Sequence, residues 1–280
     1  MSEASPAEAA RPRRGGRNVP AAIAVGLILG VGLVLIPVYW APWAFVAILA
    51  VAMILAVGEF VVLARGVGAA PPVGWLHAGV AAVVVAAAVD GTRGLLAAAA
   101  VAMAVLMAAR VIKPVEGFVK DISAAGFGLL YTGVLGAFAA LLLFADDGSD
   151  RLIVVLATAV ASDVGGYLAG VTMGRHPLAP KLSPKKTWEG LIGSFVLSMA
   201  VAVGGFVWLL DGAVWQGLVF GALIVPAAVL GDLVESALKR DAGVKDSGNL
   251  LPGHGGMLDR IDSLLLAAPV GWLLLGIMIG

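Results

Sequence analysis

Long apolar runs separated by short polar segments constrain the fold of this chain most strongly. Residues 19–38 contain no charged side chain, and 61% of the 280 residues are hydrophobic. A helix of about 20 residues spans the roughly 30 Å hydrocarbon core of a bilayer. Such runs predict membrane-spanning helices rather than the core of a soluble domain. We therefore expect an all-α fold, a polytopic integral membrane helical bundle.

Turn-forming and charged residues divide the apolar sequence into about nine expected spans. We expect an N-terminal set of transmembrane helices over 19–150. A C-terminal transmembrane region over 151–280 contains the polar loops 174–188 and 239–259. The spans are expected at 19–39, 42–64, 73–90, 94–112, 124–145, 152–173, 189–210, 214–238 and 260–279.

The basic residues predict which ends of the spans face the cytoplasm, because Lys and Arg concentrate in cytoplasmic loops. With nine spans and a cytoplasmic N-terminus, all of the 18 Lys and Arg except Arg93 and Arg151 fall in cytoplasmic segments. Residues 1–18, rich in Ala, Pro, Arg and Gly, are expected to form a disordered basic tail on that side. A cleaved signal peptide is the rival interpretation, which the long apolar run that follows disfavours.

A charged segment, 236–262, lies between two apolar runs near the C-terminus. Ionisable groups beside a membrane core usually mark a functional site. Four polar residues at the end of the preceding span have the spacing i, i+3, i+4 and i+7, which places them on one face of a helix. They are Asp232, Glu235, Ser236 and Lys239.

Carboxylates in and beside this segment indicate a metal site. Asp259 and Asp262 are three residues apart at the head of the last helix, so both can point into one space. With Asp232 and Asp246 they give up to four convergent carboxylates, oxygen ligands that suit Mg²⁺ together with substrate phosphates. The alternative is a set of interfacial salt bridges with nearby basic residues. The glycines around His254 favour a ligand site, because glycine lets a backbone approach a ligand closely.

The loop 174–188 carries a second polar cluster, formed by Arg175, Lys181, Lys185 and Lys186 next to Ser183 and Thr187. Lysine supplies a point charge and hydroxyl groups supply short hydrogen bonds, so the cluster suits a polyphosphate. Two alternatives stay open. The loop can simply fix topology or touch anionic lipids, and Thr187 with Glu189 can simply cap the next helix.

The sequence lacks the common nucleotide-binding motifs and contains no cysteine. It contains neither a G-x-x-x-x-G-K-[ST] P-loop nor a G-x-G-x-x-G run. A bound nucleotide would therefore be held by metal and basic side chains. The lack of Cys excludes disulfides, thiolate metal sites and Cys nucleophiles.

The charged segment resembles the motif of the phosphatidate cytidylyltransferase family, also called CDP-diacylglycerol synthases. The matching residues are Ser236, Lys239, Arg240, Lys245, Asp246, Gly248, Pro252, His254, Gly255, Gly256, Asp259, Arg260 and Asp262. The run SPKKTWEG at 183–190, and Asp163 with Tyr167 and Gly170, resemble further family elements. The resemblance covers about residues 160–265, with one mild departure at Gly166, where many members have Ala.

The resemblance implies a reaction in which CTP and phosphatidic acid give CDP-diacylglycerol and pyrophosphate. The lipid phosphate would attack the α-phosphorus of CTP in line, with metal and basic side chains neutralising the two anions. Mg²⁺ is the implied cofactor, and the family suggests a second cation. The expected metal ligands are Asp232, Asp246, Asp259 and Asp262. The residues expected at the reacting phosphates are Lys239, Arg240, Lys245 and Asp246. The residues expected to bind substrate are Ser183, Lys185, Lys186, Thr187, Ser236, His254, Arg260 and Asp163.

The same resemblance gives partners and a location. CTP, phosphatidic acid and membrane lipid are the expected partners, a homodimer is the suggested assembly, and no nucleic acid is expected. The protein would be integral to the bacterial cell (inner) membrane, with its active site at the cytoplasmic face.

Two alternatives come from other kinds of membrane protein. A cation- or proton-coupled transporter would use Asp163, Glu59 and Asp232 as ion sites. The charges concentrate on one face rather than along a path, which disfavours it. A CDP-alcohol phosphotransferase would need a D-G-x-x-A-R element, which is absent. Glu59 is not assigned to the expected enzyme site.

Overall fold

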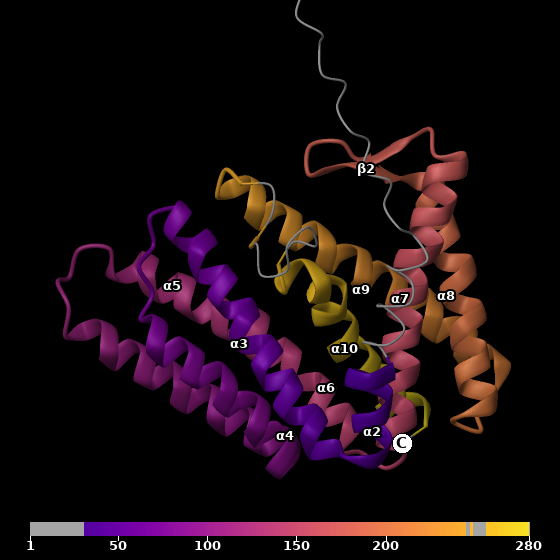
Figure 1. Ribbon diagram of the computed structural model, residues 1–280, viewed down its shortest axis with the longest axis horizontal. Coiled ribbons are helices and arrows are strands. Elements are labelled where there is room, and N and C mark those ends of the chain that lie inside the picture. Colours follow the sequence, from indigo (N-terminus) through magenta and orange to yellow (C-terminus); the bar gives the residue numbers. More distant parts are fainter. Residues whose placement is uncertain (1–30, 245–246, 249–255, 280) are drawn as a thin grey trace, which may run out of the picture.

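The computed structural model describes residues 31–244, 247–248 and 256–279, which form a helical bundle with one short β-hairpin (Figure 1). The expected all-α, polytopic class is confirmed, whereas the hairpin was not expected. The expected tail 1–18, residues 19–30 of the first span, and the candidate residues Lys245, Asp246 and His254 lie outside the described residues.

The elements follow one another with short connections. They are η1 (Val31–Leu35, π-helical), α2 (Ile36–Trp40), α3 (Pro42–Gly66), α4 (Val73–Val111), α5 (Phe118–Gly128), η2 (Leu129–Val134, π-helical), α6 (Leu135–Leu143), α7 (Gly148–Met173), β1 (Pro177–Ala179), β2 (Ser183–Thr187), α8 (Trp188–Trp208), α9 (Val214–Asp241) and α10 (Leu258–Met278).

Seven helices within the described residues are long and apolar enough to cross a membrane. They are α3, α4, the continuous helix α5–η2–α6 over 118–143, α7, α8, α9 and α10. The expected spans from 42 onwards fall on these helices, although the span expected at 124–145 begins earlier, at Phe118. The total of nine spans stays a prediction, because most of the first expected span lies outside the described residues.

The 39 residues of α4 form two antiparallel arms rather than one straight rod. The backbone leaves the helical region at Asp90 and Gly91, and Gly91 has a φ of 57° that favours glycine. A Cβ atom on Gly79 would lie 3.0 Å from the Cβ of Ala102, whereas 23 residues of straight helix would separate them by about 34 Å. The arms correspond to the separate spans expected at 73–90 and 94–112.

The basic loops gather at one end of the bundle. At that end a Cβ atom on Gly66 would lie 3.3 Å from Ala242, and the backbone N–H of Ala70 donates to Asp121 Oδ1 at 2.6 Å. The β-hairpin projects from the same end (Figure 1). At the opposite end, Tyr39 Oη donates to Asp150 Oδ1 at 2.6 Å. The structure thus joins the basic segments at one end. Which side of a membrane this end faces stays a prediction.

Small and hydroxylated residues allow α7 and α8 to pack closely. Gly165 and Gly193 face each other, and a Cβ atom on either would overlap backbone of the other helix. Ser194 Oγ donates to the carbonyl of Ser162 at 2.7 Å, and Ser198 Oγ donates to that of Thr158 at 3.0 Å. Such contacts are typical of membrane helix pairs. They fix the two helices on which one wall of the candidate site is built.

Candidate functional site

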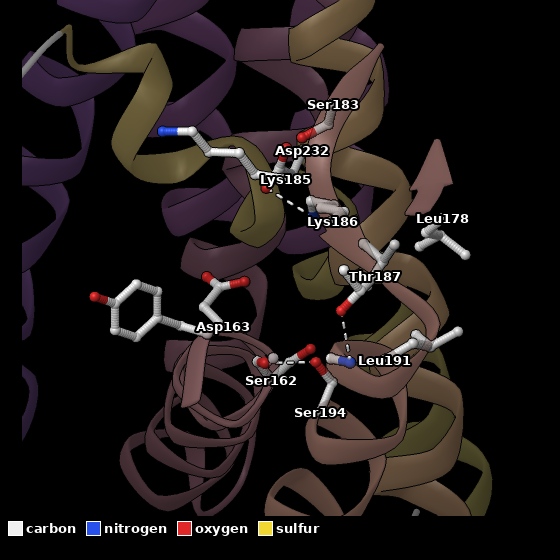
Figure 2. A pocket seen from close by; sticks show the side chains of 14 residues that line it. Ser162, Asp163, Leu178, Ser183, Lys185, Lys186, Thr187, Leu191, Ser194 and Asp232 are labelled. Carbon is white, nitrogen blue, oxygen red and sulfur yellow. Dashed lines mark hydrogen bonds and ion pairs between the residues drawn. The ribbon is translucent and has the colours of Figure 1, made fainter. Parts of the chain in front are cut away.

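A cavity of about 300 Å³ lies between α7, α8, α9 and the β-hairpin, at the end of the bundle that carries the basic loops (Figure 2). Six residues expected from the sequence line it, and they come from three parts of the chain. They are Asp163, Ser183, Lys185, Lys186, Thr187 and Asp232. Ser162, Tyr167 and Ser194 complete much of the polar lining. The structure therefore unites the loop 174–188 with the acidic face of α9.

An ion pair joins the hairpin to α9 across this cavity. Lys186 Nζ lies 2.8 Å from Asp232 Oδ2, and the two side chains are 22% and 31% exposed (Figure 2). Ser236 Oγ donates to the other oxygen of Asp232 at 3.4 Å. Because both charged groups keep contact with solvent, each can exchange its present partner for a charged ligand.

Backbone pairing and hydrogen bonds to α8 hold the hairpin that carries these polar side chains. β1 and β2 are antiparallel, with Pro177 opposite Thr187. Glu189 Oε2 accepts from the backbone N–H groups of Arg175 and His176 at 3.1 and 3.2 Å, which closes the hairpin onto α8. Thr187 Oγ1 accepts from the N–H of Gly190 at 3.1 Å and caps α8. The cap interpretation of Thr187 is thus confirmed, and the same residue also lines the cavity.

Two further carboxylates, Asp163 of α7 and Asp262 of α10, lie beside the Lys186–Asp232 pair. Asp163 is exposed to the cavity and accepts from Ser263 Oγ at 3.0 Å. Asp262 Oδ1 accepts from the N–H of Ser263 at 2.7 Å, and the charges of Asp232, Asp163 and Lys186 act on it. We call Asp163, Lys186, Asp232 and Asp262 the cavity group. It carries three acidic side chains and one basic side chain.

Asp259 belongs to a different set of contacts. Its Oδ1 lies 2.6 Å from Lys239 Nζ, while Oδ2 accepts from Ser247 Oγ at 2.8 Å and from the N–H of Gly256 at 2.9 Å. Lys239 also pairs with Glu235, a carboxylate only 1% exposed. Among the described residues, no three His, Asp or Glu side chains are arranged to hold a metal ion. The expected carboxylates therefore divide, with Asp232 and Asp262 in one group and Asp259 in another.

The remaining expected residues lie near these groups or outside the described part of the chain. Arg240 is exposed at the end of α9, and Arg260 is exposed in the first turn of α10. Ser236 is half-buried and contacts Asp232. Lys245, Asp246 and His254 are not described, so the structure does not test their expected roles.

Glu59, which the sequence did not assign to the enzyme site, contacts the charged segment directly. From α3, its Oε1 accepts from the N–H of Met257 at 2.8 Å. Its Oε2 accepts from the N–H of Leu258 at 2.8 Å and lies 3.1 Å from Ser247 Oγ. We call Glu59, Glu235, Lys239, Ser247 and Asp259 the α10 clamp. The sequence signal was a lone carboxylate inside a 25-residue apolar helix, which is a functional hint in a membrane protein.

Two buried hydroxyl groups near the site were also missed. Ser162 lines the cavity, is 1% exposed, and its Oγ has no hydrogen-bond partner among the described residues. Tyr131 is 3% exposed, its hydroxyl likewise has none there, and the charges of Asp262, Glu235 and Asp232 act on it. A buried hydroxyl usually has a partner, so an unpaired one beside a cavity is suited to a ligand. No motif spacing identifies either residue.

Comparisons with known proteins agree on one family. The sequence matches the model of the cytidylyltransferase family over residues 21–278. The phosphatidate cytidylyltransferase of Mycobacterium leprae is 38% identical over 281 residues, covering 95% of this chain and 90% of that protein. That of Mycobacterium tuberculosis H37Rv is 38% identical over 278 residues, covering 95% and 84%. That of Helicobacter pylori 26695 is 48% identical over 141 residues, covering 50% and 52%. This chain belongs to the cytidylyltransferase family.

Proposed function

We propose that this protein transfers the cytidylyl group of CTP to phosphatidic acid and forms CDP-diacylglycerol and pyrophosphate for phospholipid synthesis. Family membership and the names of the relatives support this activity. The observation that carries it is the cavity at one end of an apolar bundle, lined by Lys185, Lys186 and five hydroxyl groups. A lipid phosphate and a soluble triphosphate can meet there, since the end of a membrane helix lies near the interface.

The basic and hydroxyl groups of the hairpin would bind phosphate oxygens of the substrates. Both substrates are anions, so they repel each other unless cations lie between them. Lys185 is exposed and Lys186 half-buried at the cavity, with Ser183 and Thr187 on the same strand. Lysine and hydroxyl donors together give charge-assisted hydrogen bonds to phosphate. We assign CTP phosphates to this strand, and to a substrate oxygen the hydroxyl of Ser162, which has no partner within the described part of the chain.

The transfer would be a single in-line displacement. An oxygen of the lipid phosphate forms a bond to the α-phosphorus of CTP while the bond from that phosphorus to the pyrophosphate oxygen breaks. No covalent enzyme intermediate is needed. Lys239 and Arg240, at the end of α9, would bind the departing pyrophosphate, and the resemblance adds Lys245. Ser236, His254 and Arg260 are assigned to substrate positioning.

The residues present fit Mg²⁺. Magnesium is commonly held by one or two carboxylates with substrate phosphates and water as the other ligands. Asp232 and Asp262 supply such oxygens from neighbouring helices, and the resemblance adds Asp246 and Asp259. A bound cation would neutralise charge on the phosphates as they react. Two carboxylates, Asp163 and Asp232, that line one cavity with Lys186 paired to Asp232 are the observation that supports a cation here.

The proposed location follows from the positions of the basic loops. The end with the basic loops would face the cytoplasm of a bacterium, because CTP is soluble and basic loops stay on that side. The protein would then be integral to the cell (inner) membrane. A homodimer is proposed from the family resemblance alone.

The function is tested with the full chain purified in detergent. Labelled CTP, phosphatidic acid and Mg²⁺ are expected to give labelled CDP-diacylglycerol and pyrophosphate in equal amounts. Arg93→Ala, at the bend of α4 away from the site, serves as a control and is expected to keep wild-type activity. Failure to form the product, or labelling that does not require phosphatidic acid, would contradict the proposal.

A transporter is not favoured by the structure. The acidic residues of both groups, including Glu59, lie in the half of their helices nearest the β-hairpin. A transport path would instead need polar groups along the bundle. Uptake of a solute into proteoliposomes without consumption of CTP would reverse this preference.

A further inference from the structure

We propose that Glu59 is a positioning residue for the transfer reaction, holding the first turn of α10 and Ser247 so that Asp259 faces Lys239. This inference rests on the proposed function for its kinetic part. Glu59 is 9% exposed and lies on α3, whereas its hydrogen-bond partners follow at least 188 residues later in the chain. It does not line the cavity, so it acts through the residues that it contacts.

Glu59 satisfies backbone groups that the helix itself cannot satisfy. The first N–H groups of any α-helix have no intrahelical acceptor. At the start of α10, the N–H groups of the N-cap residue Met257 and of Leu258 donate to the two different oxygens of Glu59, each at 2.8 Å. The partial positive charge of a helix N-terminus also favours a carboxylate there. The position of this helix start is therefore fixed from α3.

Glycines in the charged segment leave space for the Glu59 carboxylate. A Cβ atom on Gly248 would lie 2.7 Å from Glu59 Oε1, and one on Gly256 would overlap Oε2 and Ser247 Oγ. Backbone thus approaches the carboxylate on both sides of 249–255. This explains two glycines of the motif by a contact inside the protein rather than by a ligand.

One hydroxyl group connects Glu59 to the charged pair. Ser247 Oγ lies 3.1 Å from Glu59 Oε2 and 2.8 Å from Asp259 Oδ2. The other oxygen of Asp259 lies 2.6 Å from Lys239 Nζ. A side chain on α3 is therefore linked through Ser247 and the start of α10 to the lysine that we assign to pyrophosphate. Loss of Glu59 would free the helix start and let Asp259 move relative to Lys239.

The kinetic consequence is a fall in kcat. Misplacement of catalytic groups by about 1 Å can lower a rate about 100-fold, so Glu59→Ala is expected to lower kcat about 10- to 100-fold. KM for phosphatidic acid is expected to stay within about twofold, because the cavity lining is unchanged. Glu59→Gln keeps the size and one acceptor oxygen, so it is expected to restore part of the lost kcat.

A second measurement does not depend on activity. Hydrogen exchange followed by mass spectrometry is expected to show faster exchange of the amides of Met257 and Leu258 in Glu59→Ala. The exchange of the distal half of α10 should not change. Asp121→Ala is a matched control, since Asp121 is also buried at this end and accepts from Arg110 Nε at 2.7 Å and from the N–H of Ala70. This control is expected to unfold at lower temperature but to keep wild-type kcat and wild-type exchange at Met257.

The outcomes separate this inference from the proposed function. An inactive wild-type protein would refute the function, while the exchange measurement would still test the positioning. Wild-type kcat in folded Glu59→Ala, or unchanged exchange at Met257 and Leu258, would refute the positioning role. If Glu59→Ala does not fold, Glu59→Gln decides, because wild-type kcat and exchange in that variant would overturn the proposal.

Discussion

The cavity group and the α10 clamp contain similar charged residues, but these residues differ in exposure and in the number of their hydrogen-bond and ion-pair contacts. In the cavity group, Lys186 and Asp232 form a pair that is about one quarter exposed, and Asp163 is open to the cavity. In the α10 clamp, Asp259 has four hydrogen-bond or ion-pair contacts, and Glu59 has three. Groups with spare capacity and solvent contact can bind ligands, whereas fully paired groups hold a backbone in place. The comparison assigns ligand binding to the cavity group, and it assigns to Glu59 and Ser247 of the α10 clamp the positioning of Asp259 and Lys239.

The largest expected effect comes from substitution of Lys186, the basic residue of the cavity group. Lys186→Ala removes the charge that faces the phosphates, and loss of one such stabilising group lowers kcat by about 100- to 1,000-fold. Initial rates of CDP-diacylglycerol formation would measure this. Lys181→Ala, an exposed lysine of the same hairpin connection, is the control and should stay within about twofold of wild type. Equal losses in both variants would mean that the loop acts only through its overall charge.

Asp259 and Asp262, two carboxylates near the start of α10, are expected to respond differently to substitution by Asn. Asp262→Asn removes one of the negative charges of the cavity group, so it should not lower stability, but it should raise the Mg²⁺ concentration needed for half-maximal activity about tenfold. Asp259→Asn breaks the half-buried pair with Lys239, and loss of such a pair costs about 1 to 3 kcal/mol of stability, less than loss of a fully buried one. Thermal unfolding and Mg²⁺ titrations of both variants test the division. Near wild-type Mg²⁺-dependent activity in either variant would count against its role as a metal ligand.

The close contact between Gly256 and Glu59 predicts that the effects of substituting these two residues on stability are not additive. Gly256→Ala places a methyl group against Glu59, and such overpacking destabilises by about 1 to 3 kcal/mol. In the Glu59→Ala background the contacts with the Glu59 carboxylate are gone and only Ser247 Oγ still meets the methyl group, so the second substitution should destabilise less. Gly276→Ala is the control, because a Cβ atom there meets nothing within 4 Å. Additive losses in denaturation experiments would show that Gly256 and Glu59 are not in close contact.

The smallest expected effect concerns the unpaired hydroxyl of the cavity. Ser162→Ala should raise the KM of one substrate about two- to fivefold, since a neutral hydrogen bond contributes about 0.5 to 1 kcal/mol. Stability should be unchanged or slightly higher, because the hydroxyl has no partner to lose among the described residues. Steady-state kinetics with each substrate varied in turn would measure the effect. A large loss of stability instead would place Ser162 with the packing of α7 rather than with the cavity.

Much of the fold could be predicted from hydropathy and turns. The seven long helices lie where apolar runs were expected, and the turn at Asp90 to Gly94 predicted the reversal inside α4. The β-hairpin was missed because its strands are only three and five residues long. The hairpin is held by Glu189, which accepts from the N–H groups of Arg175 and His176. An alternating pattern of apolar and polar residues does not predict this contact.

The sequence predicted most of the residues of the site, but it did not predict that they form two separate groups. Helical spacing placed Asp232 and Lys239 on one face, yet seven residues of helix separate them by about 10 Å. Asp232 therefore pairs with Lys186 of the hairpin, while Lys239 pairs with Glu235 and Asp259. Periodicity fixes the direction of a side chain on its own helix. It does not fix which other helix supplies the partner.

The sequence by itself determined that the chain is a helical membrane protein, which family motif it carries, and which segments are basic, because hydropathy, charge and spacing are local properties. Only the tertiary structure decided that Glu59 of α3 contacts the start of α10 and that Asp259 and Asp262 have different partners. Those contacts join residues far apart in the chain, and they depend on how closely small side chains let the helices approach.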